Sequence, residues 1–135
     1  MKARFKNWEK PRFNKYGLTK WQWMCQGTRG LKLGKNTDIG AFTYINAKYG
    51  VEIEEEAQIG SHCSIYSEST IDEIHGPVKI GKGAKVGSHS TIMPNVRIGV
   101  NSVVGANSFV KENVPDYVVA YGTPAKVVRK MKGQK

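Results

Sequence analysis

The sequence lacks the features of disulfide-rich, secreted and membrane-spanning proteins. Its 135 residues include only two cysteines, which give no disulfide framework. No apolar run approaches the roughly 20 residues that a membrane-spanning helix needs. Residues 1–13 also lack the apolar stretch and cleavage site of a signal peptide. Together these absences predict a protein of the reducing cytoplasm.

Acidic residues are scarce as well, since 11 Asp and Glu stand against 21 Lys and Arg, for a net charge of +10. The basic excess lies largely in residues 1–35 and 111–135, whereas the middle of the chain holds most of the acids. Such a charge favours an anionic partner, whether nucleic acid, an acidic membrane face or a phosphorylated cofactor. A nucleic-acid binder would more often show a basic stripe with interleaved aromatics on one face. We therefore expect no nucleic-acid partner.

What the sequence does contain is an aliphatic residue at every sixth position, often followed by glycine and, four places on, by a small residue. A period of six fits neither the 3.6-residue turn of a helix nor simple strand alternation. It is typical of the hexapeptide repeat of a parallel β-helix. The aliphatic positions are Leu33, Ile39, Ile45, Ile53, Ile59, Ile65, Ile71, Ile80, Val86, Ile92, Ile98, Val104 and Val110. The small positions include Thr37, Thr43, Ala57, Cys63, Ala84, Ser90, Ser102 and Ser108.

The period breaks twice. Two extra residues stand between Ile45 and Ile53, around Tyr49 and Gly50, and three stand between Ile71 and Ile80. Insertions in a solenoid leave the core and project as loops, often on the binding face. Both breaks are therefore candidate functional segments.

The repeat divides the chain into three parts. Residues 31–113 form the solenoid, with three hexads in each of about four coils. Residues 1–30 are aromatic and basic, and we expect them to cap the open end of the solenoid. A membrane-surface anchor is the weaker alternative, because the apolar positions show no clean amphipathic spacing. Residues 114–135 form an extended segment and a basic tail, which either crosses to a neighbouring subunit or closes the second end.

The three histidines are the candidate catalytic residues. His75 lies in the second break, close to Asp72 and Glu73, and an imidazole beside a carboxylate suits general-base chemistry. The competing interpretation is a solvated loop histidine. His62 and His89 occupy the same place of the repeat, which predicts that they lie one strand spacing apart. A zinc site usually needs three protein ligands plus water, and we expect no metal.

A second set of residues suits an extended, phosphorylated ligand. Small turn residues such as Ser88 and Ala106 let a ligand lie close to the backbone amides. Lys111, Lys126 and Arg129 form a basic set near the tail that could hold phosphates. The competing interpretation for each lysine is a solvated surface charge.

Residues 31–130 resemble the hexapeptide-repeat acetyltransferases. The segments that carry the resemblance are PVKIGKGAKVGSHSTIMPNVRIGVNSVVGANSFV, with the loop histidine before it, and the closing VPDYVVAYGTPAKVVRK. Sugar acetyltransferases of surface-polysaccharide biosynthesis resemble the chain most. Galactoside, xenobiotic and serine acetyltransferases are similar but more distant.

The resemblance implies an all-β, left-handed parallel β-helix that assembles into a homotrimer with active sites between subunits. It implies acetyl-CoA as the acyl donor, with its pantetheine arm beside Ser88 and Ala106. The nucleotide end would meet Lys111, Lys126 and Arg129. The loop histidine removes the acceptor's proton, and His75 holds that position, so we rank it before His89 and His62. Asn46, beside the first break, is a candidate contact to the acceptor.

The function expected from the sequence is therefore acetyl transfer to a hydroxyl or amine of a sugar, either nucleotide-linked or saccharide. Peripheral contact with the inner membrane face is a weaker expectation. Two alternatives stay open. A γ-carbonic-anhydrase-like metalloenzyme would need three histidines around a metal, and the spacings between the three here do not resemble that pattern. A non-catalytic β-helix would bind no coenzyme A.

Overall fold

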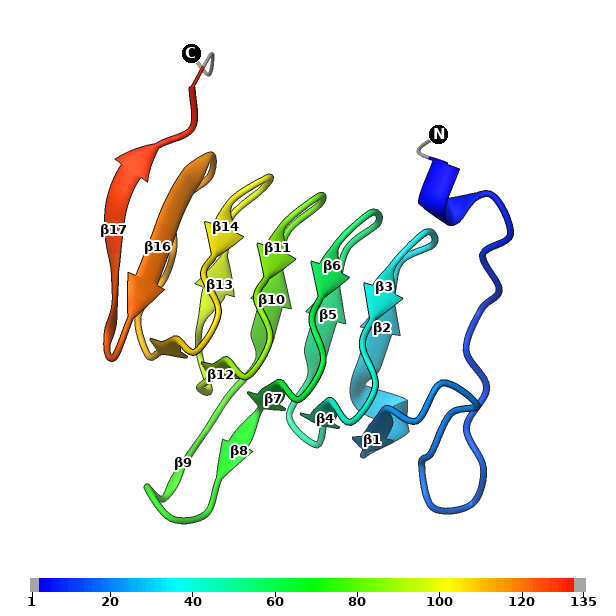
Figure 1. The fold of residues 1–135 in the computed structure, drawn as a ribbon. Coiled ribbons are helices and arrows are strands. Elements are labelled where there is room, and N and C mark those ends of the chain that lie inside the picture. The colour runs from blue at the N-terminus through cyan, green and yellow to red at the C-terminus, as the bar shows by residue number, and fades with distance from the viewer. Residues whose placement is uncertain (1–2, 133–135) are drawn as a thin grey trace.

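The computed structural model describes residues 3–132 and forms a parallel β-helix (Figure 1). Short strands stack into three sheets that wrap around one core, and the chain advances along the axis by one strand spacing with each coil. The strand triplets β2–β4, β5–β7, β10–β12 and β13–β15 make four complete coils. The parallel β-helix of about four coils predicted from the repeat is confirmed.

Each sheet takes one strand from each coil. Sheet A contains β1 (Met24–Gln26), β4 (Tyr44–Asn46), β7 (Ser64–Tyr66), β12 (Thr91–Ile92) and β15 (Phe109–Val110). Sheet B contains β2 (Leu31–Leu33), β5 (Val51–Ile53), β10 (Val78–Ile80) and β13 (Arg97–Ile98). Sheet C contains β3 (Asp38–Ile39), β6 (Gln58–Ile59), β11 (Lys85–Val86), β14 (Val103–Val104), β16 (Val118–Gly122) and β17 (Ala125–Lys130). A hairpin of β8 (Glu68–Ser69) and β9 (Ile74–His75) and two 3-10 turns, η1 (Ala3–Phe5) and η2 (Thr28–Gly30), complete the elements.

The core consists of the repeated aliphatic side chains stacked in register. In sheet A, Ile45 pairs with Ile65, Ile65 with Ile92 and Ile92 with Val110, and all four side chains are buried. The small residues that follow are buried at the turns. The hydroxyl of Ser102, for example, donates to the carbonyl of Gly99 at 2.7 Å. Such hydroxyls find a hydrogen-bond partner inside the turn, as buried polar groups require.

The prediction that Ile71 is an inward repeat position is wrong, because its side chain is 94% exposed. The chain leaves the solenoid after Tyr66 and returns at Val78, so the insertion is the whole of residues 67–77. This insertion folds as the β8–β9 hairpin, which projects from the coils in Figure 1. Ile71 falls on the hexad spacing without entering the core.

Both breaks in the repeat lie at the same edge of the solenoid, where sheet A passes into sheet B. We call this edge the hairpin corner; it comprises residues 47–50, 67–77 and 93–96. The opposite edge of sheet A, where sheet C passes into it, we call the histidine corner; it comprises residues 40–43, 60–63, 87–90 and 105–108.

The two ends differ in detail from the sequence-based boundaries. Strand β1 already pairs with β4, so the solenoid begins before the boundary expected at residue 31. Trp23 is buried with the core and meets the ring of Phe13 edge-on at 5.5 Å. At the other end, β17 folds back antiparallel onto β16 of the same chain. Between residues 3 and 132, no helix is long and apolar enough to cross a membrane.

Candidate active site

His75 lies on β9, at the base of the hairpin that projects from the hairpin corner. Its imidazole stacks on the ring of Tyr49, with centroids 4.2 Å apart and planes at 25°. The side-chain amide of Asn95 donates to the His75 carbonyl at 3.2 Å. The next N–H, that of Gly76, donates to the carbonyl of Ser67 at 2.8 Å. The imidazole is exposed, but its backbone and one ring face are held in place.

The acidic residue that pairs with His75 is not one of the two expected from the sequence. Asp72 accepts a hydrogen bond from the Ser69 hydroxyl at 2.5 Å, within the turn of the hairpin. Glu68 instead stands directly opposite His75 across the hairpin, and such pairs place their side chains on one face. Glu68 is the acidic residue that sequence reasoning missed. Its pairing depends on the register of a hairpin that the spacing did not predict.

A lysine joins this cluster from the preceding coil. The ammonium of Lys48 lies 3.7 Å from a carboxylate oxygen of Glu68 and 5.5 Å from the centroid of the Tyr49 ring. Lys48, Tyr49, Glu68 and His75 therefore form one cluster at the hairpin corner, which we call the His75 cluster. It joins an aromatic stack, an ion pair and an imidazole, and the imidazole is a group able to act in general acid–base catalysis.

Asn46 ties the same corner together. Its side-chain oxygen accepts from the hydroxyl of buried Ser67 and from the N–H of Lys48, both at 3.1 Å. Asn46 also lines a groove of about 750 Å³ on the outer face of sheet A. Other lining residues are Gln26, Tyr44, Tyr66, Thr91, Met93, Phe109 and hairpin residues 68–72. Aromatic rings, hydroxyls and amides suit the apolar faces and hydroxyl groups of a sugar.

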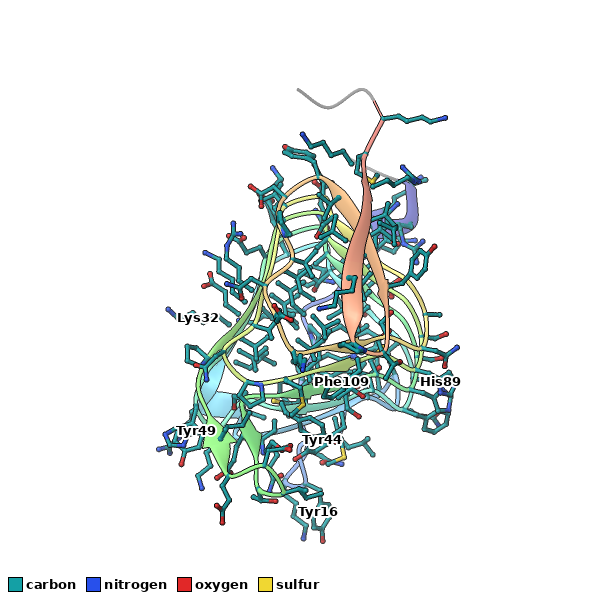
Figure 2. All side chains as sticks on the ribbon, turned by 90° about the vertical axis from the view of Figure 1, so that its left-hand side faces the viewer. Tyr16, Lys32, Tyr44, Tyr49, His89 and Phe109 are labelled. Atoms are coloured by element: carbon teal, nitrogen blue, oxygen red, sulfur yellow. The ribbon has the colours of Figure 1, made fainter. Side chains whose placement is uncertain are left out.

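His62 and His89 stack as the repeat predicted, with ring centroids 4.7 Å apart and planes at 9°. Both lie at the histidine corner, where each adopts a positive φ, 57° and 61°, that turns its side chain outward. Phe42 packs against His62 at a tilt, with ring centroids 5.1 Å apart and planes at 41°. In Figure 2, which labels His89 and Tyr49, the two residues lie at opposite edges of sheet A. The structure thus separates His75 from the other two histidines.

The residues expected along coenzyme A fall into two places. Ser88 and Ala106 lie one coil apart at the histidine corner, and the N–H of Asn107 donates to the Ser88 carbonyl at 2.9 Å. The coils approach so closely that a Cβ on Gly87 would lie 2.4 Å from the Ala106 nitrogen. Because Gly87 has no side chain, the two turns can lie close together. We call the continuous backbone at Ser88 and Ala106 the coenzyme rail.

The three basic residues are spread over the C-terminal end of the solenoid. Lys126 pairs across β16–β17 with Tyr121, whose side chain lies against Gly105 at the histidine corner. The ammonium of Lys126 also lies 3.5 Å from a carboxylate oxygen of Glu112. Arg129 pairs with Val119 further along β17, and Lys111 follows β15 at the far edge of sheet A. Of the three, Lys126 is the one nearest to Ser88 and Ala106 in the fold.

Neither cysteine is suited to nucleophilic catalysis. Burial raises the pKa of the Cys25 thiol to about 11 and also raises the pKa of Cys63. Both thiols are therefore protonated at neutral pH, whereas the thiolate is the nucleophile. Among residues 3–132, no three His, Cys, Asp or Glu side chains lie close enough together to hold a metal ion.

The comparisons with known proteins agree with the fold. The family model described as bacterial transferase hexapeptide (six repeats) matches residues 74–112. The galactoside O-acetyltransferase of Lactococcus lactis is 34% identical over 113 residues, which cover 73% of this chain. The chain spans only 55% of the length of that relative.

Two solved structures share the architecture. A hexapeptide-repeat acetyltransferase from Vibrio cholerae superposes with a TM-score of 0.76 at 27% identity, covering 82% of this chain and 68% of that one. AntD, an N-acyltransferase from Bacillus cereus solved with dTDP and 3-hydroxybutyryl-CoA, superposes with a TM-score of 0.68 at 25% identity. That match covers 85% of this chain and 79% of AntD.

Proposed function

The chain belongs to the hexapeptide-repeat acetyltransferase family, and from this premise we propose that it transfers the acetyl group of acetyl-CoA to a sugar. The acceptor group is a hydroxyl or an amine of a nucleotide-linked sugar or a saccharide, in surface-polysaccharide biosynthesis. AntD, which was solved with 3-hydroxybutyryl-CoA, supports a coenzyme A thioester as the donor. A relative bound to dTDP and a relative named for galactosides support the acceptor class.

The observation that carries this proposal is the His75 cluster. His75 is an exposed residue, and its imidazole is stacked on the ring of Tyr49. A base needs this combination, because it must reach the acceptor while its orientation is fixed. His75 rather than His89 or His62 is our catalytic base, because a carboxylate lies across from it.

The chemistry at His75 is a proton transfer coupled to acyl transfer. A neutral nitrogen of the imidazole accepts the proton of the acceptor hydroxyl or amine as its oxygen or nitrogen attacks the thioester carbonyl. Glu68, opposite the ring, stabilises the imidazolium that forms. The tetrahedral intermediate then collapses with cleavage of the C–S bond, and the imidazolium returns the proton to the coenzyme A thiolate. No external oxidant or metal enters this sequence.

Coenzyme A is proposed to lie along the histidine corner. The rail at Ser88 and Ala106 offers backbone N–H and C=O groups to the pantetheine amides. Lys126, with Arg129 further along β17, would meet the phosphates at the C-terminal end, whereas Lys111 lies at the other edge of sheet A and would reach them from a neighbouring copy. Asn46 and the groove beside it would hold the sugar. We place the reaction in the cytoplasm.

The separation of the two corners supports a trimer with active sites between subunits. The coenzyme A rail and the His75 cluster lie at opposite edges of sheet A, so one chain does not bring them together. A neighbouring copy that presents its hairpin corner to this histidine corner completes the site. The proposed assembly is a homotrimer, in which three such contacts close a ring.

The test is acetyl-CoA turnover by the intact protein, followed as thiol release, with a panel of amino and hydroxyl nucleotide sugars. His75→Ala should lower kcat for a hydroxyl acceptor by about a hundredfold or more. His62→Ala is the matched control, because it removes an exposed, stacked imidazole of the other corner. A kcat for His75→Ala within a few-fold of the parent would contradict the assignment of the base. No turnover with any sugar would contradict the function itself.

A further inference from the structure

The turn formed by residues 14–22, at the first end of the solenoid, exposes three apolar side chains. Tyr16 is 72% exposed, Leu18 41% and Trp21 39%. In Figure 2, Tyr16 stands clear of the coils at the edge of the molecule. Large apolar side chains that gather on one exposed turn commonly mark an interaction surface. We call Tyr16, Leu18 and Trp21 the apolar triad.

The turn that carries the triad is firmly built. The side-chain oxygen of Asn14 accepts from the N–H groups of Tyr16 and Leu18, at 2.8 and 3.0 Å. The N–H and hydroxyl of Thr19 both donate to the carbonyl of buried Trp23. The triad is therefore held out in solvent by a bonded scaffold, and little order is lost when it meets a partner.

Cations surround the triad. Residues 1–35 contain ten Lys and Arg but a single acid, Glu9, and this segment accounts for most of the net charge of +10. The ammonium of Lys15 lies 5.1 Å from the centroid of Tyr16, and that of Lys20 lies 4.9 Å from Trp21. Lys10, Arg12, Lys20 and Trp21 line one open hollow. Glu9 is already engaged in an ion pair with Lys20.

The combined chemistry selects among possible partners. A second copy would bring the same positive turn and be repelled. Nucleic acid would use the cations and the rings, but Leu18 offers nothing to phosphate or base. At the surface of an anionic bilayer, Tyr and Trp prefer the headgroup region, Leu prefers the acyl boundary, and Lys and Arg meet lipid phosphates.

We propose that this turn docks the protein on the surface of an anionic lipid bilayer, with the apolar triad inserted among the headgroups. The docking is peripheral and reversible, because three partly inserted side chains and a few cations give modest affinity. This inference is independent of the acetyltransferase proposal. It gives the aromatic and basic N-terminal segment a role beyond covering the end of the solenoid.

The experiment is co-sedimentation of the intact protein with vesicles of phosphatidylcholine alone, or of phosphatidylcholine and phosphatidylglycerol in equal parts. Binding is expected only to the anionic vesicles and should weaken with salt. Arg12→Gln with Lys15→Gln should weaken binding about fivefold for each cation removed. The matched control, Lys82→Gln with Lys85→Gln, removes the same charge from exposed positions on the coils and should change binding less than twofold.

A second pair of variants separates lipid insertion from general charge attraction. Tyr16→Ser with Leu18→Ser keeps the charge and should weaken binding about tenfold or more. Anionic vesicles should also shield Trp21 from a soluble quencher, and Trp21→Phe should abolish that protection. Two results would overturn the proposal. One is an equal loss of vesicle affinity for the double variant at Arg12 and Lys15 and for its control at Lys82 and Lys85. The other is an unchanged affinity for Tyr16→Ser with Leu18→Ser. Displacement from the vesicles by single-stranded RNA at equal phosphate concentration would instead identify a nucleic-acid surface.

Discussion

The ring of Tyr49 lies flat against the imidazole of His75, although the two residues come from successive coils and are separated by a full turn of the solenoid. The two breaks in the repeat supply one residue each, because each residue stands where the coil is longer than the hexad requires. The lengthened corner thus brings together a base and the surface that orients it.

Tyr49→Ala should therefore lower kcat by roughly tenfold to a hundredfold, because the freed imidazole samples unproductive orientations. Tyr49→Phe keeps the stacking face and should retain most of the activity. The KM for acetyl-CoA should not change in either variant, since the coenzyme rail lies at the other corner. Steady-state kinetics with a hydroxyl acceptor measures both constants.

The matched control for Tyr49→Ala is Phe42→Ala, which removes the aromatic ring that packs at a tilt against His62. In a His75→Ala background, Tyr49→Ala should have no further effect, because residues that act as a unit are not additive. An equal loss in both backgrounds would mean that Tyr49 acts on something other than His75.

Mixed trimers test whether the active site lies between subunits. His75→Ala removes the base, and Ala106→Trp should block the coenzyme rail, so each variant alone should be inactive. Random mixing of the two should restore roughly a quarter of the parental activity, because some interfaces then combine two intact halves. The measurement is turnover after the two variants are refolded together. Activity no higher than the sum of the separate variants would place the site within one chain.

The stability of two isoleucine variants tests the boundary of the hairpin. Ile65→Ala removes a buried side chain from the core stack of sheet A and should lower the free energy of unfolding by about 2–5 kcal/mol. Ile71→Ala changes a side chain that is fully outside the core and should change the free energy of unfolding by less than about 0.5 kcal/mol. Urea denaturation followed by circular dichroism compares the pair. A similar loss in the free energy of unfolding for both variants would mean that Ile71 is a core residue.

The buried thiol of Cys25 predicts a pH dependence of stability. The folded protein holds this proton up to a pKa of about 11, against an ordinary value of 9.0. The folded state therefore binds more protons than the unfolded state above pH 9. The contribution of Cys25 to stability is complete below that pH and is lost as the pH rises towards 11.

Cys25→Ala isolates this effect from the lysines and tyrosines that titrate in the same range. The difference in unfolding midpoint between parent and variant should be constant up to pH 9 and shrink above it. A difference that grows with pH would mean that the buried group is the thiolate.

The regular part of the molecule was predictable, because each hexad repeats one set of contacts. The spacing placed His62 and His89 one above the other, and the structure stacks them at 4.7 Å. It placed Ser88 and Ala106 on neighbouring turns. Once the period is known, register follows from the need to bury every aliphatic residue.

The hairpin of residues 67–77 was less predictable, because outside the repeat the position of a residue in the sequence no longer indicates its position in the fold. Ile71 keeps the six-residue spacing by coincidence, yet Asp72 stands where glycine often follows and His75 where a small residue recurs. These departures do not signal that the chain has left the coil, because buried Ile45 and Ile92 also lack both the glycine and the small residue. The pairing of Glu68 with His75 had no signal in the spacing either, since a hairpin's register depends on its turn.

The hairpin of residues 67–77 leaves and rejoins the solenoid at neighbouring points, where the Gly76 N–H meets the Ser67 carbonyl. The coil above makes the same passage with residues 93–96 alone, and the sheets keep their register on both sides. The hairpin is therefore an insertion that can be exchanged for another loop while the coils keep their strand register. If the acceptor binds as proposed, we expect its specificity to change by insertion and deletion in this hairpin, without any compensating change in the coils.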